Sequence, residues 1–364
     1  MSELKVDTIV DAAGTGKPNF SNGVTMNGAA LSTLNLGEYT ASSSEPSSPE
    51  NGSIWWDTAN EKIFIYIAGE WKETIGIAAA AWYGARGIFR GGIQQSTYNR
   101  LTNIDYITIA STGNATDFGD GTYGASHPAA ASDSSRAVFG GGVTPIVNII
   151  EYITTSSTGN ATDFGDLSEA QFGIAGCGDG TYALFGGGHS TGNRIDYITV
   201  QTTGNASDFG DLTVSKYTRG ALNDATYGVW GGGDAVTNVM DYVTIQTTGN
   251  ATDFGDLTQT TKGLSGCSDA TRGLFGGGHN GSGNTNVIEY ITVASTGNGT
   301  DFGDLTSARE GTAACSDGTY GVFGGGSYTN VMDYVTIQST GNAQDFGDLS
   351  TSLGYAAGCS GAAS

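Results

Sequence analysis

The sequence predicts an all-β protein, a six-bladed β-propeller that closes by pairing its N- and C-terminal strands and follows a small β-rich attachment segment. Three observations support this fold class. A stretch close to STGNATDFGDL occurs six times, and its phenylalanines recur every 44 to 48 residues, the spacing of a four-stranded blade. The 60 glycines among 364 residues argue against a helical repeat. Each repeat is also rich in Thr, Val, Ile, Tyr and Phe, which favour strands.

The repeat over residues 258–305 shows how each element is predicted. Its four strands are expected within 258–269, 272–278, 287–293 and 299–305. Asp269 opens the turn between the first two strands, because its carboxylate can bond the backbone N–H groups that follow. In the STGN turn between the last two, Gly297 and Asn298 are expected to tolerate a positive φ. Four short antiparallel strands in this order form one blade.

A run of glycines ends the second strand of every repeat. In the repeat above, Gly276, Gly277 and Gly278 directly follow Phe275. Glycine lets backbones converge where side chains would collide, as they must near the axis of a propeller. We therefore expect the aromatic residue before each run to pack between neighbouring blades.

The two ends of the array complete one blade. Residues 85–92 (ARGIFRGG) resemble a second strand with no first strand before it, and residues 351–360 (TSLGYAAGCS) resemble a first strand with no second strand after it. Pairing the two removes exposed sheet edges. The glycine run, the tyrosine-containing third strand and the aromatic residue before GDL resemble the kelch family over residues 77–364. That resemblance implies partner binding through the loops joining second to third and fourth to first strands.

Composition and motif context exclude several functions. The formal net charge of −22, without clustered Lys and Arg, argues against nucleic acids and anionic membranes as partners. The most apolar run, residues 75–82, is too short for a membrane span, and the N-terminus lacks a signal-peptide pattern. DFG recurs six times without a kinase catalytic loop, and GTGKP (14–18) lacks the first glycine and the hydroxyl of a phosphate-binding loop.

Several reactive side chains are interpreted as structural. The four cysteines, each in a first strand, are expected to be buried free thiols. An Asp-x-x-Asp pair and an acid before the third-strand tyrosine recur in every repeat; they are expected to bond backbone N–H groups, with weak Ca²⁺ binding as the alternative. His189, Asp234 and His279 occupy equivalent places after their glycine runs and are interpreted as a variable loop position. No cofactor and no metal site are predicted.

Residues 1–76 do not follow the repeat. Residues 1–38 alternate short strand-like runs with turns and have too little apolar mass to fold alone, so they are expected to pair with other chains. Residues 39–76 combine a linker with three short strands over 53–73. The core of this small sheet is expected from Trp55, Trp56 and Trp71.

The N-terminal segment resembles tail-fibre and related virion proteins of tailed bacteriophages, particularly those of marine cyanobacteria. The stretches that carry the resemblance are SELKVDTIVDAAGTGKPNFSNGVTMNGAALSTLN and SSSEPSSPENGSIWWDTANEKIFIYIAGEWKE. The resemblance implies docking of the N-terminus on other tail or virion proteins. It also implies synthesis in the cytoplasm of a bacterial host, a location in the virion and assembly as a homo-oligomer, expected to be a trimer.

We expect a phage virion appendage, similar to a tail fibre or spike, whose propeller loops recognise a host surface receptor. A glycan is the favoured receptor, and a host surface protein is the alternative. The loops after the glycine runs and after each GDL differ most between copies, which indicates a recognition face on a rigid frame. The candidate binding residues are Tyr98, His189, Asp234, His279, Asn280 and Tyr328.

No catalytic residue is predicted, and the protein is not expected to be an enzyme. A polysaccharide-degrading enzyme would need a carboxylate pair or a nucleophile that breaks the symmetry of the repeat, and most acids follow it. The main alternative is a purely structural role in the virion or baseplate; the enzyme is the less favoured one.

Overall fold

The computed structural model describes residues 84–361 except 134, 144, 190, 191 and 270. Before them it describes residues 24–26, 29–31, 39–42, 44, 46–47, 53–57, 62–67 and 70–73. The contacts divide the chain into two units, Met1–Ala78 and Ala79–Ser364, and each is described by itself. The regular elements of the described residues are all strands, which confirms the all-β prediction.

The N-terminal unit contains two small sheets. β1 (Val24–Met26) pairs antiparallel with β2 (Ala29–Leu31), and the rest of the predicted attachment segment, 1–38, lies outside the described residues. A second sheet has the order β3 (Tyr39–Ser42), β4 (Ile54–Asp57), β5 (Lys62–Ile67) and β6 (Glu70–Glu73). β4, β5 and β6 are the predicted three strands. β3 was not predicted, because four residues next to a linker carry too little periodicity; it pairs parallel with β4.

Aromatic rings pack within the second sheet. Trp55 is buried and stacks on Phe64, its cross-strand partner, with ring centroids 4.8 Å apart. Trp71 meets Trp55 edge to face at 5.7 Å. Two of the three predicted core tryptophans therefore lie together, and the side chain of Trp56 lies outside the described ones.

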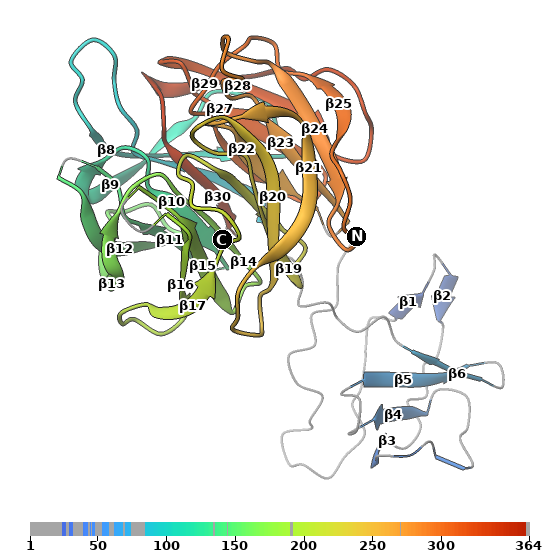
Figure 1. Cartoon of the computed structure of the whole chain (residues 1–364). Coiled ribbons are helices and arrows are strands. Elements are labelled where there is room, and N and C mark those ends of the chain that lie inside the picture. Colours follow the sequence, from blue (N-terminus) through green and yellow to red (C-terminus); the bar gives the residue numbers. More distant parts are fainter. Residues whose placement is uncertain are drawn as a thin grey trace. The chain divides into compact units, whose positions relative to one another are not determined.

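Six four-stranded antiparallel sheets form the blades of a β-propeller, as predicted (Figure 1). Blade 1 comprises β30 (Ala357–Gly361), β7 (Arg86–Arg90), β8 (Leu101–Thr108) and β9 (Thr116–Ala125). Blade 2 comprises β10 (Ala129–Ser132), β11 (Arg136–Gly140), β12 (Val147–Thr154) and β13 (Thr162–Gln171). Blade 3 comprises β14 (Ile174–Gly178), β15 (Tyr182–Gly187), β16 (Arg194–Thr199) and β17 (Ser207–Asp211).

The remaining three blades repeat the same order of strands. Blade 4 comprises β18 (Gly220–Asn223), β19 (Tyr227–Gly231), β20 (Thr237–Thr244) and β21 (Thr252–Thr261). Blade 5 comprises β22 (Ser265–Ser268), β23 (Arg272–Gly276), β24 (Val287–Thr292) and β25 (Thr300–Asp304). Blade 6 comprises β26 (Ala313–Ser316), β27 (Tyr320–Gly324), β28 (Thr329–Thr336) and β29 (Gln344–Leu353).

The ring closes as predicted, through a blade built from both ends of the array. β30 pairs antiparallel with β7 over five positions, from Ala357 opposite Arg90 to Gly361 opposite Arg86. The fourth strands run further than expected in blades 1, 2, 4 and 6, where they continue past the GDL or GDG segment. The third strands of these blades start earlier and pair with the added residues beyond a register shift.

The hydrophobic core consists of clusters between adjacent blades, each spanning one of the six joints. At five of the six joints, the aromatic residue before a glycine run lies over the first glycine of the preceding blade's run. A Cβ added to Gly140 would meet the ring of Phe185 at 3.3 Å, and one added to Gly186 would meet Trp230 at 2.7 Å. The expected packing of these aromatics between blades is confirmed.

The repeated eleven-residue stretch forms a belt that joins each blade to the one before it. At the joint of blades 1 and 2, the backbone N–H groups of Gly159 and Ala161 donate to the carbonyls of Phe118 and Asp120, both at 2.8 Å. The side-chain oxygen of Asn160 accepts the N–H of Asp120 at 3.0 Å. The same three bonds recur at all six joints. Each STGN turn therefore covers the outer edge of a neighbouring blade, which explains the six copies.

The STGN turn differs from expectation in its backbone, because neither Gly297 nor Asn298 has a positive φ. Asn298 instead reaches back to the N–H of Asp256 in the preceding blade. The glycine of DFG does need glycine: Gly255 has φ +141°, and an added Cβ would lie 2.5 Å from the Gly297 carbonyl oxygen.

The acid before each third-strand tyrosine also joins two blades. Asp105 accepts the backbone N–H of Ser350 at 2.9 Å and its hydroxyl at 2.7 Å. Asp333 likewise accepts from Thr306. In all six copies the donor is the Ser or Thr after the GDL or GDG of the preceding blade. The expected structural role of these buried acids is confirmed.

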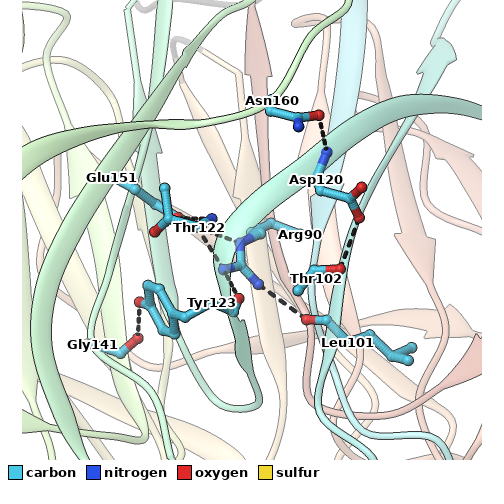
Figure 2. A network of polar contacts seen from close by, with 9 residues as sticks. All are labelled: Arg90, Leu101, Thr102, Asp120, Thr122, Tyr123, Gly141, Glu151 and Asn160. Atoms are coloured by element: carbon cyan, nitrogen blue, oxygen red, sulfur yellow. Dashed lines mark hydrogen bonds and ion pairs between the residues drawn. The ribbon is translucent and has the colours of Figure 1, made fainter.

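Blade 1 departs from the repeat at two positions that face its joint with blade 2. Arg90 stands where the other blades have the first glycine of the run, and Gly121 stands where they have the leucine of GDL. The Arg90 guanidinium fills the space of that leucine, since a Cβ added to Gly121 would lie 2.3 Å from it. It forms an ion pair with Glu151 at 2.5 Å, and both side chains are fully buried (Figure 2).

Candidate functional site

The loops that join second to third and fourth to first strands meet at one mouth of the central channel. In each blade, one residue shortly before the first strand has a left-handed backbone, with φ between 55° and 69°. Each donates its backbone N–H to the carbonyl of its equivalent in the preceding blade, at 2.7 to 2.9 Å. These residues form a closed circle, named here the mouth ring: His127, Gly173, Thr218, Gly263, Gly311 and Tyr355.

A second set of backbone bonds ties the two kinds of loop together. His189 donates its N–H to the carbonyl of Phe172 at 3.1 Å, and Asp234 donates to that of Tyr217 at 2.9 Å. His279 and Lys262 exchange two such bonds at 2.8 and 3.1 Å. In these three blades, backbone hydrogen bonds therefore hold the residue after the glycine run against the residue that directly precedes the mouth-ring residue.

A cavity of about 140 Å³ opens beside the mouth ring. It is lined by His127, Tyr217, Thr218, Asp234, Lys262, Gly263, Glu310 and Tyr355. This group, named here the mouth pocket, combines three rings, two carboxylates, one ammonium group and one hydroxyl. Three smaller cavities lie along the channel. Two of about 80 Å³ are lined by the first strands, and one of about 60 Å³ is lined by the six mouth-ring residues and the residue after each of them.

Aromatic contacts fix the rings around the mouth pocket. His127 stacks on Tyr355 with centroids 4.0 Å apart, and the other side of the Tyr355 ring lies against Gly311. Tyr217 meets His189 edge to face at 5.3 Å, and His189 stacks on Phe172 at 4.7 Å. These contacts leave the rings little rotational freedom, so the walls of the pocket are preorganised.

Charges in the mouth pocket are only partly neutralised. One oxygen of Asp234 accepts the Tyr217 N–H at 2.9 Å. Lys262 forms no ion pair with the side chains that the structure describes. Burial, and then the adjacent Glu310 carboxylate, raise the pKa of Tyr355, so its phenol remains protonated at neutral pH.

Of the six predicted binding residues, only Asp234 lines the mouth pocket, and His189 lies next to it against Tyr217. Tyr98 is 63% exposed in the β7–β8 loop, in a left-handed conformation with φ 53°. Ile146, in the equivalent loop of blade 2, is 39% exposed. Of the described large hydrophobic side chains, these two are the exposed ones, and both lie on the predicted recognition loops.

The other predicted residues are held by their own loops or are partly buried. His279 Nδ1 accepts the N–H of Gly281 at 3.0 Å, and Asn280 Oδ1 accepts those of Ser282 and Gly283 at 3.0 and 3.1 Å. Tyr328 is half-buried, with φ 61°. His189, Asp234 and His279, the three equivalent loop positions, therefore already make intramolecular bonds or ring contacts.

Sequence reasoning missed the residues next to the mouth ring. The structure adds His127, Tyr217, Lys262, Glu310 and Tyr355 to the lining of the mouth pocket. A signal was present in the sequence: the position just before the mouth ring reads Ser, Phe, Tyr, Lys, Glu and Gly in the six copies. A position that varies this much within a repeated frame is typical of a binding surface.

The reactive groups elsewhere have structural surroundings. All four cysteines are free and buried, as expected. Burial raises the pKa of each thiol, so none is a ready nucleophile. In the described part of the chain, no three His, Cys, Asp or Glu side chains are grouped so that they could hold a metal ion.

Comparison with known proteins gave no match, either among protein-family models or among curated proteins. In the described residues, no helix has the length and apolarity needed to cross a membrane.

Acidification is expected to weaken the mouth ring through His127. Burial, and then the charge of Arg100, lower the pKa of His127 to about 4, whereas an unfolded histidine titrates near 6.5. Between these values the unfolded chain binds a proton that the folded chain does not, so stability falls as pH drops from about 6.5 to about 4 and then levels off. The loss from this residue should be about 2–3 kcal/mol.

Urea unfolding at several pH values measures this contribution. The His127→Asn variant should lose less stability than the wild type over that interval, because asparagine tolerates the left-handed backbone and does not titrate. His189→Asn, an exposed histidine on the same face, is the matched control and should behave as the wild type. Equal pH dependence of the wild type and His127→Asn would contradict the prediction.

Proposed function

We propose that this protein is a phage virion appendage, of the tail-fibre or spike type, whose kelch-like propeller binds a glycan on the host surface. The observation that carries the binding role is the mouth pocket together with the loops around it. Rings, carboxylates and an ammonium group vary from copy to copy there, while the belts and clusters at the six joints repeat. A rigid frame that holds variable loops is the common arrangement of binding proteins.

The virion context rests on the resemblance of the N-terminal segment to phage tail proteins. That segment would dock on other virion proteins and assemble the chain as a trimer, so that several propellers face one cell. Multiple weak contacts would then add to a strong attachment. A chain starting at residue 77 is the direct check, because it should remain a soluble monomer by light scattering while the full chain assembles.

Adsorption to marine cyanobacterial cells tests the binding role. The Tyr98→Ala/Ile146→Ser variant removes the two exposed hydrophobic side chains of the recognition loops, and its stability should change by less than about 0.5 kcal/mol per site. We expect the labelled full chain to adsorb to host cells and this variant to adsorb less. The control is Thr112→Ala/Thr202→Ala, which changes two exposed threonines in turns at the opposite ends of the strands.

The outcomes separate the proposal from its alternatives. Absence of adsorption by the wild-type chain would favour the purely structural role in the virion. Shortening of host polysaccharide during incubation with the protein would favour the enzyme. Equal loss of adsorption in both double variants would show that the binding site does not lie on this face of the propeller.

A further inference from the structure

We infer that the mouth pocket is the primary subsite of the protein and takes a single neutral sugar unit of a saccharide chain. This inference rests on the proposed binding of a host glycan and names the place and the chemistry of that binding. It is carried by the fixed walls of the pocket, its mixture of donors and acceptors, and its charge.

The pocket is built on the mouth ring. Four of the residues that line it, His127, Thr218, Gly263 and Tyr355, belong to the mouth ring, whose six hydrogen bonds form a complete circle. The same circle borders the neighbouring cavity of about 60 Å³ in the channel. The fold therefore fixes these walls, and a sugar unit can enter from the open side without rearranging the backbone.

Side chains alone must recognise the occupant, because the mouth ring uses its own backbone N–H and C=O groups. Asp234 and Glu310 supply acceptors, and the Lys262 ammonium group supplies donors. The Tyr355 phenol is hydrogen-bonded to Glu310 and orients that carboxylate. Sugar hydroxyls both donate and accept, so neighbouring hydroxyls need such a mixed set. The walls made by Tyr217 and His127 offer apolar surface to the C–H face of a pyranose ring.

The charge of the pocket argues against an anionic occupant. Two carboxylates face one ammonium group, and the whole chain carries a net charge of −22. A uronic acid or a sulfated sugar would be repelled by the overall field. A neutral hexose or an N-acetylated sugar can use both carboxylates and the ammonium group through hydrogen bonds, without placing a second ammonium group beside Lys262.

Saturation-transfer NMR with the full chain tests the assignment. The probes are the methyl glycosides of glucose, galactose, mannose and N-acetylglucosamine, with methyl glucuronide and methyl glucosaminide as charged comparisons. We expect at least one neutral glycoside to bind, and both charged ones to bind at least about tenfold more weakly. Failure of all neutral probes, or preference for a charged one, would overturn the neutral-sugar assignment.

Variants locate the site. The Asp234→Asn/Glu310→Gln variant keeps acceptor oxygens in place, including the one for the Tyr217 N–H, but removes both negative charges. It should lower the affinity for the glycoside at least about tenfold. The matched control, Asp163→Asn/Asp253→Asn, removes two exposed carboxylates that do not line the pocket and should bind as the wild type. Equal affinity of both variants would overturn the site.

Cell adsorption distinguishes failure of this inference from failure of the proposed function. If the wild type adsorbs and Asp234→Asn/Glu310→Gln adsorbs equally well at matched folded fraction, the mouth pocket is not the subsite, although the binding function stands. If the wild type does not adsorb at all, the proposed function itself fails. Reduced adsorption of the pocket variant alone, together with glycoside binding, supports both.

Discussion

Ending the chain at Leu353 is expected to abolish the single cooperative unfolding transition of the propeller. The deletion removes β30 and, with it, the five paired positions that join the last strand to β7. It also removes Tyr355 and so opens the mouth ring. The exposed edge of β7 and the opened cores on both sides of blade 1 should make the shortened chain aggregate or melt over a broad range.

Circular dichroism during urea and thermal unfolding, together with light scattering, measures the effect of this deletion. The matched control ends the chain at Gly361, after β30, and should unfold like the full chain. Adding a peptide of residues 354–364 in trans should partly restore cooperative unfolding, because an edge strand can be supplied by another chain. A shortened chain with the wild-type unfolding midpoint would contradict closure by β30.

Replacing Arg90 by glycine is expected to lower the free energy of unfolding by about 3–5 kcal/mol. The substitution leaves Glu151 buried without its cation and empties the space beside Gly121. It also removes hydrogen bonds to the carbonyls of Tyr123 at 2.7 Å and Leu101 at 3.3 Å (Figure 2). Urea unfolding of the purified variant measures the loss.

Adding Gly121→Leu to Arg90→Gly should restore most of the lost stability. Arg90→Gly/Gly121→Leu recreates the combination found between blades 4 and 5, where Gly231, Leu257 and a buried Glu289 meet without an arginine. Leucine should refill the space, and Glu151 should keep the N–H of Thr122, so most of the lost stability should return.

Burial raises the pKa of Glu289, the acid that occupies the position of Glu151 in blade 5. Arg194→Met, which breaks a partly exposed ion pair with Asp196, is the control and should cost less than about 1 kcal/mol. A double variant no more stable than Arg90→Gly would show that the two substitutions are independent.

The sequence predicted some residues of the candidate site and missed others. The sequence predicted the loops that border the mouth pocket, because copies of one frame differ most where they are free of the core, as at His189 and Asp234. It did not identify Tyr217, Lys262 and Glu310 as neighbours. These residues are far apart in the chain, and only the closing of the ring brings them around one pocket.

The sequence by itself determined the fold. Six copies of one stretch fixed the number of blades, the alternation within each copy fixed the strands, and the split copy at the two ends fixed the closure between β30 and β7. These features are local or repetitive, so a single chain displays them without its contacts.

Only the tertiary structure decided how the blades are joined. The circle of hydrogen bonds from His127 to Tyr355, and the ion pair of Arg90 with Glu151, involve residues of different blades. Partners across a joint follow from the distance between blades and the volume of side chains in the folded ring. Neither quantity is written in the spacing of a sequence, because spacing records distance along the chain and packing depends on distance in space.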